Sequence, residues 1–296
     1  MRPGLITFKV QRPLEFGDLP ESAFATVIGE SLGRGETTAA LLPLLGESPS
    51  ALHVFRRQPW QAEQGEDSDL LALRRQCAEL PLKLSPQSPW IADVIVGDVG
   101  EPLMFGRHRS GLPAHPVAGA LPELSLPAHA PSRAWLKMRQ ALAWLELGES
   151  QLQGLSALEL GSAPGGASLA LLEMGMNVIG VDSAAMHPLV LGHPKFQHLR
   201  LSAGAVGPKE LPMRVDLLCC DMNLHPGVSL RYCRKLCRLL QPRWTIFTLK
   251  INDDSVASEI GQWVDSISSW APARIHARTL PANRREITVV SALPQS

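Results

Sequence analysis

A strand that runs into a glycine-rich turn is the feature that most constrains the fold of this chain. The mainly apolar run 155–160 enters the turn 161–166 (GSAPGG), and an apolar-periodic segment, 167–172, leaves it. This order predicts a strand, a tight turn and a helix N-terminus, where backbone N–H groups face an approaching ligand. The glycine spacing differs from the GxGxxG dinucleotide fingerprint, and no GK[ST] follows as in a phosphate loop. Packing alone also accounts for such a turn, so the rest of the chain must show whether the turn binds a ligand.

Strands alternate with helices from residue 157 onward. Strands are predicted at 157–161, 177–182, 197–201, 215–221, 244–250, 274–280 and 286–291, and helices at 165–174, 232–240 and 256–270. The earlier strands are joined through helices or long crossovers, which predicts parallel neighbours, whereas the short loop between the last two predicts an antiparallel pair. The sequence therefore predicts an α/β fold with a mostly parallel, doubly wound sheet and an antiparallel late strand.

Residues 1–111 are predicted to form a separate, small α+β region. We expect a strand at 5–10, helices at 22–32, 37–45 and 70–80, a strand at 50–55, and a hairpin of 90–96 with 101–105. Gly33-Arg34-Gly35 is expected to end the first of these helices. Five prolines in 112–131 predict a stiff, extended linker. Ser132 is then a suitable N-cap for a helix over 133–147.

Composition limits the classes of function. Lys and Arg total 28 and Asp and Glu total 28, so the chain is not basic overall, and any nucleic-acid surface must be local. An odd number of cysteines, five, without framework spacing favours a reduced intracellular protein. Cys233 and Cys237 lack further ligands nearby in sequence, so we expect no metal site there. Without an apolar leader or a bilayer-length apolar run, we expect a cytoplasmic protein, with a monomer as the default.

Charged residues follow the predicted strands at one edge of the sheet. In an open parallel sheet, ligands bind beyond the carboxyl ends of the strands. Asp182 ends the second strand, Asp221 the fourth and Lys250 the fifth, and Glu286 begins the reversed final strand. Each of these residues also has a purely structural interpretation. Asp182 can cap a strand or helix, Asp221 and Lys250 can form an ion pair, and Glu286 can be a surface charge at a strand end. The position of Asp182, one βαβ step after the turn, favours a role on a ribose hydroxyl.

These motifs, taken in order, resemble a known family. They are Pro131-Ser132-Arg133 with Lys137, LGxxPGG at 160–166, Val181-Asp182, Cys220-Asp221-Met222, Leu249-Lys250 and Arg285-Glu286-Ile-Thr-Val. The set resembles the FtsJ-type S-adenosylmethionine-dependent RNA 2′-O-methyltransferases, and most of all the type that acts on bacterial large-subunit ribosomal RNA. The resemblance extends over residues 106–290. It implies a class I, Rossmann-like methyltransferase domain over 132–296.

The resemblance also implies a site and a substrate. It implies a catalytic tetrad of Lys137, Asp221, Lys250 and Glu286. It implies S-adenosyl-L-methionine as methyl donor, held by Gly161, Ala163, Pro164, Gly165, Gly166, Asp182 and Asp221. The partner is RNA, most of all ribosomal RNA. A fainter match at 52–55 and 91–109 suggests that residues 1–111 are a reduced THUMP-like RNA-binding module.

Our hypothesis for the chemistry is that Lys250 orients a ribose 2′-hydroxyl and accepts its proton. A lysine can do so only in its neutral form, which the nearby Lys137 cation favours and the carboxylates of Asp221 and Glu286 oppose. Arginines are the candidate phosphate contacts, and three of them, Arg133, Arg284 and Arg285, flank the tetrad. The others are Arg56, Arg57, Arg74, Arg75, Arg107, Arg109 and Arg139.

Two departures from the family keep an alternative open. Ala203 stands where the relatives carry an acidic residue, and Ala134 where they carry a serine. A catalytically impaired RNA-binding or ribosome-associated protein that retains the fold is therefore the alternative. A nucleotide-dependent oxidoreductase is disfavoured because the GxGxxG motif is missing. A messenger-RNA cap methyltransferase would share the tetrad but matches less of the sequence.

Overall fold

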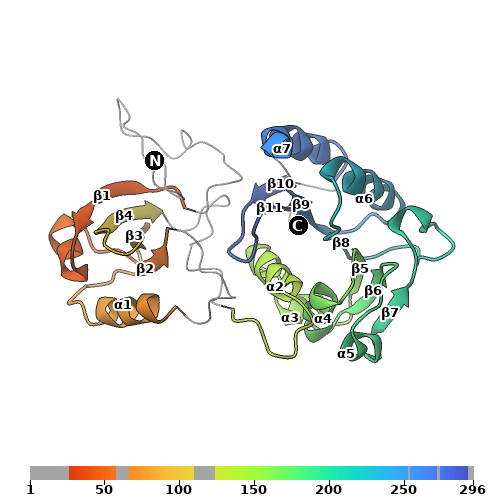
Figure 1. Ribbon diagram of the computed structural model, residues 1–296, viewed down its shortest axis with the longest axis horizontal. Coiled ribbons are helices and arrows are strands. Elements are labelled where there is room, and N and C mark those ends of the chain that lie inside the picture. Colours follow the sequence, from red (N-terminus) through yellow and green to blue (C-terminus); the bar gives the residue numbers. More distant parts are fainter. Residues whose placement is uncertain (1–26, 58–66, 110–123, 253, 272–273, 293–296) are drawn as a thin grey trace. The chain divides into compact units, whose positions relative to one another are not determined.

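The computed structural model describes residues 27–57, 67–109, 124–252, 254–271 and 274–292. The chain divides into two compact units, and the main division lies between Leu121 and Pro122 (Figure 1). None of the helices in the described ranges has both the length and the apolar character needed to cross a membrane. The strand predicted at 5–10 and most of the predicted linker lie outside the described residues.

The N-terminal unit is built on a four-stranded sheet in the order β1-β4-β3-β2. β3 (Trp90–Val96) and β4 (Leu103–Arg109) form the predicted antiparallel hairpin, and β2 (Ala51–Arg56) pairs with β3 in parallel. The helix α1 (Ser68–Ala78) and the 3-10 helix η2 (Thr38–Leu44) contribute to the core on one face. That core is formed by Leu41, Val54, Cys77, Ala92, Val94 and Phe105.

One element of this unit corrects the sequence prediction. The helix predicted at 22–32, with its stop at Gly33–Gly35, is contradicted by the strand β1 (Glu30–Gly35). β1 pairs antiparallel with the edge of β4, and its register shifts between Ser31 and Gly33. A free strand edge offers backbone hydrogen bonds to any chain that lies beside it, so this long-range pairing outweighs a helix-like apolar spacing.

The C-terminal unit contains, within the described residues, a seven-stranded sheet in the order β10-β11-β9-β8-β5-β6-β7. The strands are β5 (Ser156–Leu160), β6 (Asn177–Val181), β7 (Phe196–Leu199), β8 (Leu217–Cys220), β9 (Trp244–Lys250), β10 (Arg274–Arg278) and β11 (Glu286–Ala292). β5 to β9 pair in parallel, and β11 is antiparallel to both β9 and β10. The predicted mostly parallel sheet with an antiparallel late strand is confirmed.

Helices cover both faces of this sheet (Figure 1). On one face, α6 (Pro226–Leu240) and α7 (Asp254–Ser268) pack on alternate strand residues such as Leu158, Leu218 and Phe247. On the other face lie α2 (Ala134–Trp144) and α4 (Gly166–Glu173), which pack against each other. Because side chains alternate along a strand, the residues between those core positions face α2 and α4.

Some helix boundaries differ from the predicted ones. α2 begins at Ala134, so Arg133 rather than Ser132 is its N-cap, although the Ser132 hydroxyl still accepts a hydrogen bond from the Ala134 N–H at 3.3 Å. α6 begins at Pro226, six residues before the prediction, because a proline fits the first helical turn. The short helices α3 (Glu149–Leu152), α5 (Pro188–Leu191) and η4 (Ala203–Ala205) were not predicted, since a single turn leaves no period to detect.

The contact between α2 and α4 requires a glycine at the start of α4. A Cβ atom on Gly166 would lie 2.2 Å from Ser132 Oγ, 2.7 Å from Ser132 O and 3.0 Å from Trp135 N. Two of these three atoms belong to the backbone at the start of α2, which cannot turn away as a side chain can. Gly166 therefore fixes how closely α2 approaches the start of α4.

We expect Gly166→Ala to lower the free energy of unfolding by about 1–3 kcal/mol, because the extra carbon overfills this contact. Gly261→Ala is a matched control: Gly261 lies in α7, and a Cβ there meets no atom within 4 Å. Replacing it should stabilise the protein by about 0.5–1 kcal/mol through helix propensity. Urea unfolding of both variants measures the difference. Equal stability of the two variants would contradict the role of Gly166.

Candidate active site

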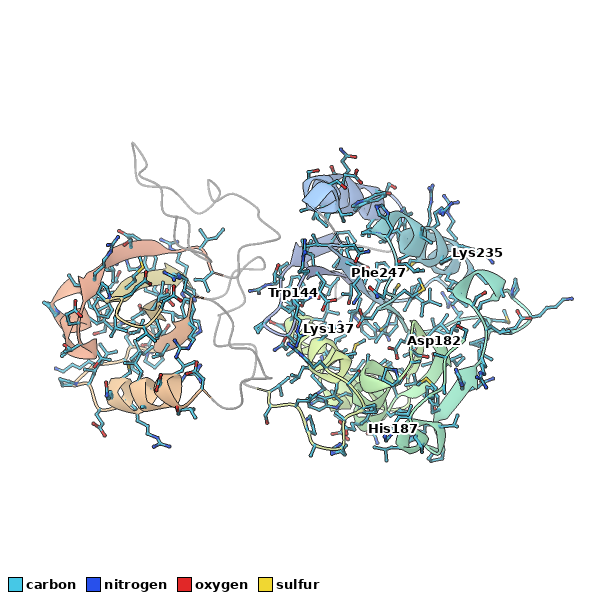
Figure 2. All side chains as sticks on the ribbon, viewed as in Figure 1. Lys137, Trp144, Asp182, His187, Lys235 and Phe247 are labelled. Atoms are coloured by element: carbon cyan, nitrogen blue, oxygen red, sulfur yellow. The ribbon has the colours of Figure 1, made fainter. Side chains whose placement is uncertain are left out.

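Four charged side chains meet on the α2 face at the carboxyl edge of the sheet. Lys250 ends β9 and is in register with Glu286, the first residue of β11. Both alternate with core residues of the opposite face, Leu249 and Ile287, so both point toward α2. Asp221 follows β8 on the same side, and Lys137, which Figure 2 labels, comes from α2.

The four side chains form a closed ring of alternating charge. Lys137 Nζ lies 2.8 Å from Asp221 Oδ2 and 2.9 Å from Glu286 Oε1. Lys250 Nζ lies 2.6 Å from Asp221 Oδ1 and 2.6 Å from Glu286 Oε2. Every carboxylate oxygen of the ring thus receives one ammonium group, and the four formal charges sum to zero. The side chains are 9–15% exposed, which leaves the ring accessible from one side.

The ring decides the charge state of Lys250. Burial alone lowers the pKa of its ammonium group, but the charges of Asp221 and Glu286 and their hydrogen bonds outweigh burial. The pKa of Lys250 therefore lies above the ordinary lysine value. In this arrangement Lys250 keeps its proton and donates hydrogen bonds. The two carboxylates thus set the protonation state of Lys250, which the sequence alone left open.

The predicted donor-binding turn lies next to the ring. Gly161 and Gly165 have φ values of +78° and +114°, which favour glycine, and the Ala163–Pro164 peptide bond is cis. The Ala163 N–H donates to Asp182 Oδ2 at 3.1 Å, and the Ala184 N–H donates to Asp182 Oδ1 at 2.9 Å. Asp182, which follows β6 (Figure 2), therefore anchors the turn through its carboxylate.

Asp221 connects the turn to the ring. Its backbone N–H donates to the carbonyl of Leu160 at 3.0 Å, immediately before Gly161. Its carboxylate accepts from both lysines of the ring. The structure thus brings together the four predicted catalytic residues and the six predicted turn and strand-end residues, which are Gly161, Ala163, Pro164, Gly165, Gly166 and Asp182.

Three residues hold the loop before Glu286, and sequence reasoning missed two of them, Gln140 and Asn283. Gln140 Oε1 of α2 accepts from the Ala282 N–H at 2.8 Å, and Arg133 Nη2 donates to the Ala282 carbonyl at 3.3 Å. Asn283 Oδ1 accepts from the Leu280 N–H at 3.1 Å. These contacts fix the start of β11 against α2, and hence Glu286 against Lys137. No local pattern in the sequence marks Gln140, because its partner is 142 residues away.

Glu159 is a second residue that the sequence prediction left without a role. It lies on β5 on the α2 face, is 1% exposed, and accepts a hydrogen bond from Ser168 Oγ of α4 at 2.5 Å. Burial raises the pKa of Glu159 to about 8; the Ser168 hydrogen bond opposes this, and the nearby charges of Asp221 and Asp182 add to it. A cavity of about 10 Å³, the size of one water molecule, is lined by Glu159, Lys137 and Asp221 among others. Glu159 is thus a neutral carboxylic acid beneath the ring.

Several of the arginines predicted as phosphate contacts are engaged within the protein. Arg56 pairs with Asp67, and Arg57 pairs with Asp98 and, at 2.7 Å, with Glu101. Arg74 donates to the carbonyl of Val54. Arg107 pairs with Glu30 and Glu47, and the guanidinium groups of Arg107 and Arg109 lie 4.3 and 4.9 Å from the ring centroid of Trp90. Arg284 and Arg285 are exposed immediately before Glu286.

The two departures from the family fall at defined places. Ala134 is the first residue of α2 and lines the small cavity beneath the ring. Ala203 begins η4 after β7, is half-buried, and packs against the core on the α6 and α7 face. Neither replacement removes a member of the ring.

Comparison with known proteins agrees with this geometry. Residues 130–257 match the family model described as FtsJ-like methyltransferase. The chain contains an FtsJ-like methyltransferase domain. The matched region includes the turn, Lys137, Asp182, Asp221 and Lys250, whereas Glu286 lies beyond it.

Two curated relatives are similar to more than half of this chain. The "Ribosomal RNA large subunit methyltransferase M" of Xylella fastidiosa (strain M12) is 30% identical over 227 residues, 74% of this chain and 62% of that protein. The protein of the same name from Halorhodospira halophila (strain DSM 244 / SL1) is 33% identical over 182 residues, 61% of this chain and 51% of that protein. The chain thus spans less than two thirds of either relative.

The buried acid beneath the FtsJ-like site gives the stability of the protein a defined pH dependence. Between about pH 5 and pH 8 the unfolded chain has released the Glu159 proton while the folded chain keeps it. The free energy of unfolding should therefore fall as pH rises, by on the order of 1.4 kcal/mol per pH unit. Glu159→Gln, which has the shape of the protonated acid, should remove this fall and be the more stable protein at pH 7.

Urea unfolding at intervals across that pH range measures the effect. Glu149→Gln, a change at an exposed carboxylate on α3, is the control and should leave the pH dependence as it is in the unmodified chain. If Glu159→Gln and the unmodified chain show the same slope of stability against pH, Glu159 is not a buried neutral acid.

Proposed function

We propose that this protein is an S-adenosylmethionine-dependent methyltransferase that methylates a ribose 2′-hydroxyl in RNA, specifically in large-subunit ribosomal RNA. The observation that carries the proposal is the closed Lys137–Asp221–Lys250–Glu286 ring beside the glycine turn. The FtsJ-like domain supports the reaction class, and the names of the two relatives support ribosomal RNA as substrate.

The residues of the turn fit the proposed donor. α4 begins at Gly166, so its first backbone N–H groups lack helical partners and face the carboxyl edge of the sheet. Asp182 presents a carboxylate at the end of β6, which suits a ribose diol, and Asp221 presents another beside the turn. When bound, S-adenosylmethionine supplies an electrophilic methyl group on a sulfonium. In our proposal Gly161, Ala163, Pro164, Gly165, Gly166, Asp182 and Asp221 hold it.

The ring supplies what a ribose hydroxyl needs in order to react. A hydroxyl is a poor nucleophile while it keeps its proton, so the site must orient it and take that proton. Lys250 and Lys137 can orient the hydroxyl oxygen by donating hydrogen bonds. In our proposal Lys250 also accepts the proton, and Asp221 and Glu286 hold the two lysines at fixed positions.

The raised pKa of Lys250 sets a condition on this role. The ring stabilises its ammonium form, so Lys250 must lose a proton before it can accept one. A second cation brought next to the ring, in addition to Lys137, lowers the cost of the neutral form. The sulfonium of the donor carries such a charge, which links proton acceptance by Lys250 to occupancy of the turn.

RNA must approach the exposed side of the ring. Arg284 and Arg285 are exposed directly before Glu286, and Arg133 lies at the start of the helix that carries Lys137. Guanidinium groups at these positions can bind phosphates on either side of the target nucleotide. We assign these three arginines to phosphate contact, and we assign residues 1–111 to a reduced THUMP-like RNA-binding module.

Lys250→Ala should lower the methylation rate by at least about 100-fold, because it removes the proposed proton acceptor. Binding of S-adenosylmethionine, measured by calorimetry, should remain, since the turn is intact. Lys195→Ala, at an exposed lysine that donates to the Gly175 carbonyl, is the control and should retain the rate. If Lys250→Ala turns over at a rate near that of the unmodified chain, Lys250 is not the proton acceptor. Donor binding by the unmodified chain without methylation of any ribosomal RNA would favour the impaired RNA-binding alternative.

The pH dependence of the rate tests the charge state of Lys250. Below its raised pKa, the neutral fraction of this lysine increases tenfold per pH unit. The logarithm of the single-turnover rate at saturating donor and RNA should therefore rise with a slope near one between about pH 6 and pH 8. A rate independent of pH across this range would show that Lys250 is not the proton acceptor.

A further inference from the structure

A cluster of two histidines and one aspartate lies in the N-terminal unit, outside the site described above. His53 on β2 is paired in register with Asp93 on β3, and Asp93 is paired with Gly106 on β4. His108 lies two residues beyond Gly106, so all three side chains point to the same face of the sheet. This is the face opposite to α1 and η2, because Val54, Val94 and Phe105 pack on that other side.

Both imidazoles present the same ring nitrogen to one carboxylate. His108 Nδ1 lies 2.8 Å from Asp93 Oδ2 and 2.9 Å from Asp93 Oδ1, and His53 Nδ1 lies 3.2 Å from Asp93 Oδ1. Asp93 and His108 are 2% exposed and His53 is 13% exposed. One donor atom from each of the three residues can be chosen so that all lie within 4.8 Å of one another.

A carboxylate this deeply buried requires a positive charge beside it. Among the salt bridges of the described residues, the partners of Asp93 are His53 and His108 alone. Arg107, next to His108 in the sequence, pairs instead with Glu30 and Glu47. A metal ion between the three side chains would supply that charge.

The donor set and its spacing suit a metal ion. Two imidazole nitrogens and one carboxylate oxygen are ligands that Zn²⁺ and other divalent transition metals prefer. With bonds of roughly 2.0–2.2 Å, ligand atoms in a tetrahedral site stand about 3.3 Å apart, near the nitrogen–oxygen distances of this cluster. His108 Nε2 is buried without a partner among the described residues whether Nδ1 carries a proton or a metal. The Nδ1 atoms are thus the imidazole nitrogens that can bind the ion.

We infer that His53, Asp93 and His108 bind a divalent transition-metal ion, represented by Zn²⁺, which joins β2, β3 and β4. Both imidazoles bind the ion through Nδ1 in their neutral form, and a proton displaced from Nδ1 leaves to solvent. The more exposed edge, at His53, is where water completes the coordination. Because the ligands come from three strands, the ion stabilises the folded sheet and not the unfolded chain.

Zinc binding by the full chain tests this inference. The protein is first dialysed against a chelator and then titrated with ZnCl₂ by calorimetry, and thermal unfolding is followed with and without Zn²⁺. We expect one Zn²⁺ per chain and a higher unfolding temperature when it is bound. His108→Gln and Asp93→Asn should lose both effects. His129→Gln, at an exposed histidine that pairs with Glu173 in the other unit, should keep both.

His53→Gln separates loss of metal binding from loss of folding. His53 is the least buried of the three residues, and its replacement leaves the His108–Asp93 pair intact. It too should lose stoichiometric Zn²⁺ binding while its circular dichroism matches that of the unmodified chain. If the unmodified chain binds no Zn²⁺, or if His53→Gln and His108→Gln bind it as tightly as the unmodified chain, the cluster is a hydrogen-bonded charge pair and the inference fails. Neither result depends on methyltransferase activity.

Discussion

The FtsJ-like site depends on one electrostatic constraint, which is that four charges held away from most of the solvent must cancel among themselves. Lys137, Asp221, Lys250 and Glu286 do so in a ring in which each carboxylate oxygen meets one ammonium. Removing one member leaves an uncompensated charge, which is far more costly than removing a surface ion pair. The register of β9 with β11 and the close contact of α2 with α4 at Gly166 both serve to bring these charges together.

The net charge around the ring depends on Glu159. An ionised Glu159 would add a negative charge beneath the ring, near Asp221, and would tighten the hold of the site on both lysine protons. Burial between β5 and α4 prevents this at neutral pH by keeping the acid protonated. The protein therefore loses some stability as the pH rises toward 8, and the ring has one negative charge fewer beside it. The stability of the fold and the net charge at the site are linked through one buried side chain.

The parts of this structure that the sequence predicts are those in which a local pattern and a general rule coincide. Strand periodicity and the rule that parallel strands end at one edge placed Asp182, Asp221, Lys250 and Glu286 together, and the structure places them so. Contacts with no local signature escaped prediction: the β1 pairing with β4, the Gln140 anchor and the surroundings of Glu159. Sequence also could not weigh burial against charge at Lys250, because that balance depends on distances of a few ångströms.

The two clusters of this protein answer the same physical problem in different ways. A carboxylate removed from water needs a positive partner, and in the FtsJ-like domain lysines provide it. In the N-terminal unit, the salt-bridge partners of Asp93 among the described residues are two histidines, whose ring nitrogens are also metal ligands. In our inference, a divalent metal ion bound by these nitrogens and by Asp93 supplies the positive charge in the N-terminal unit.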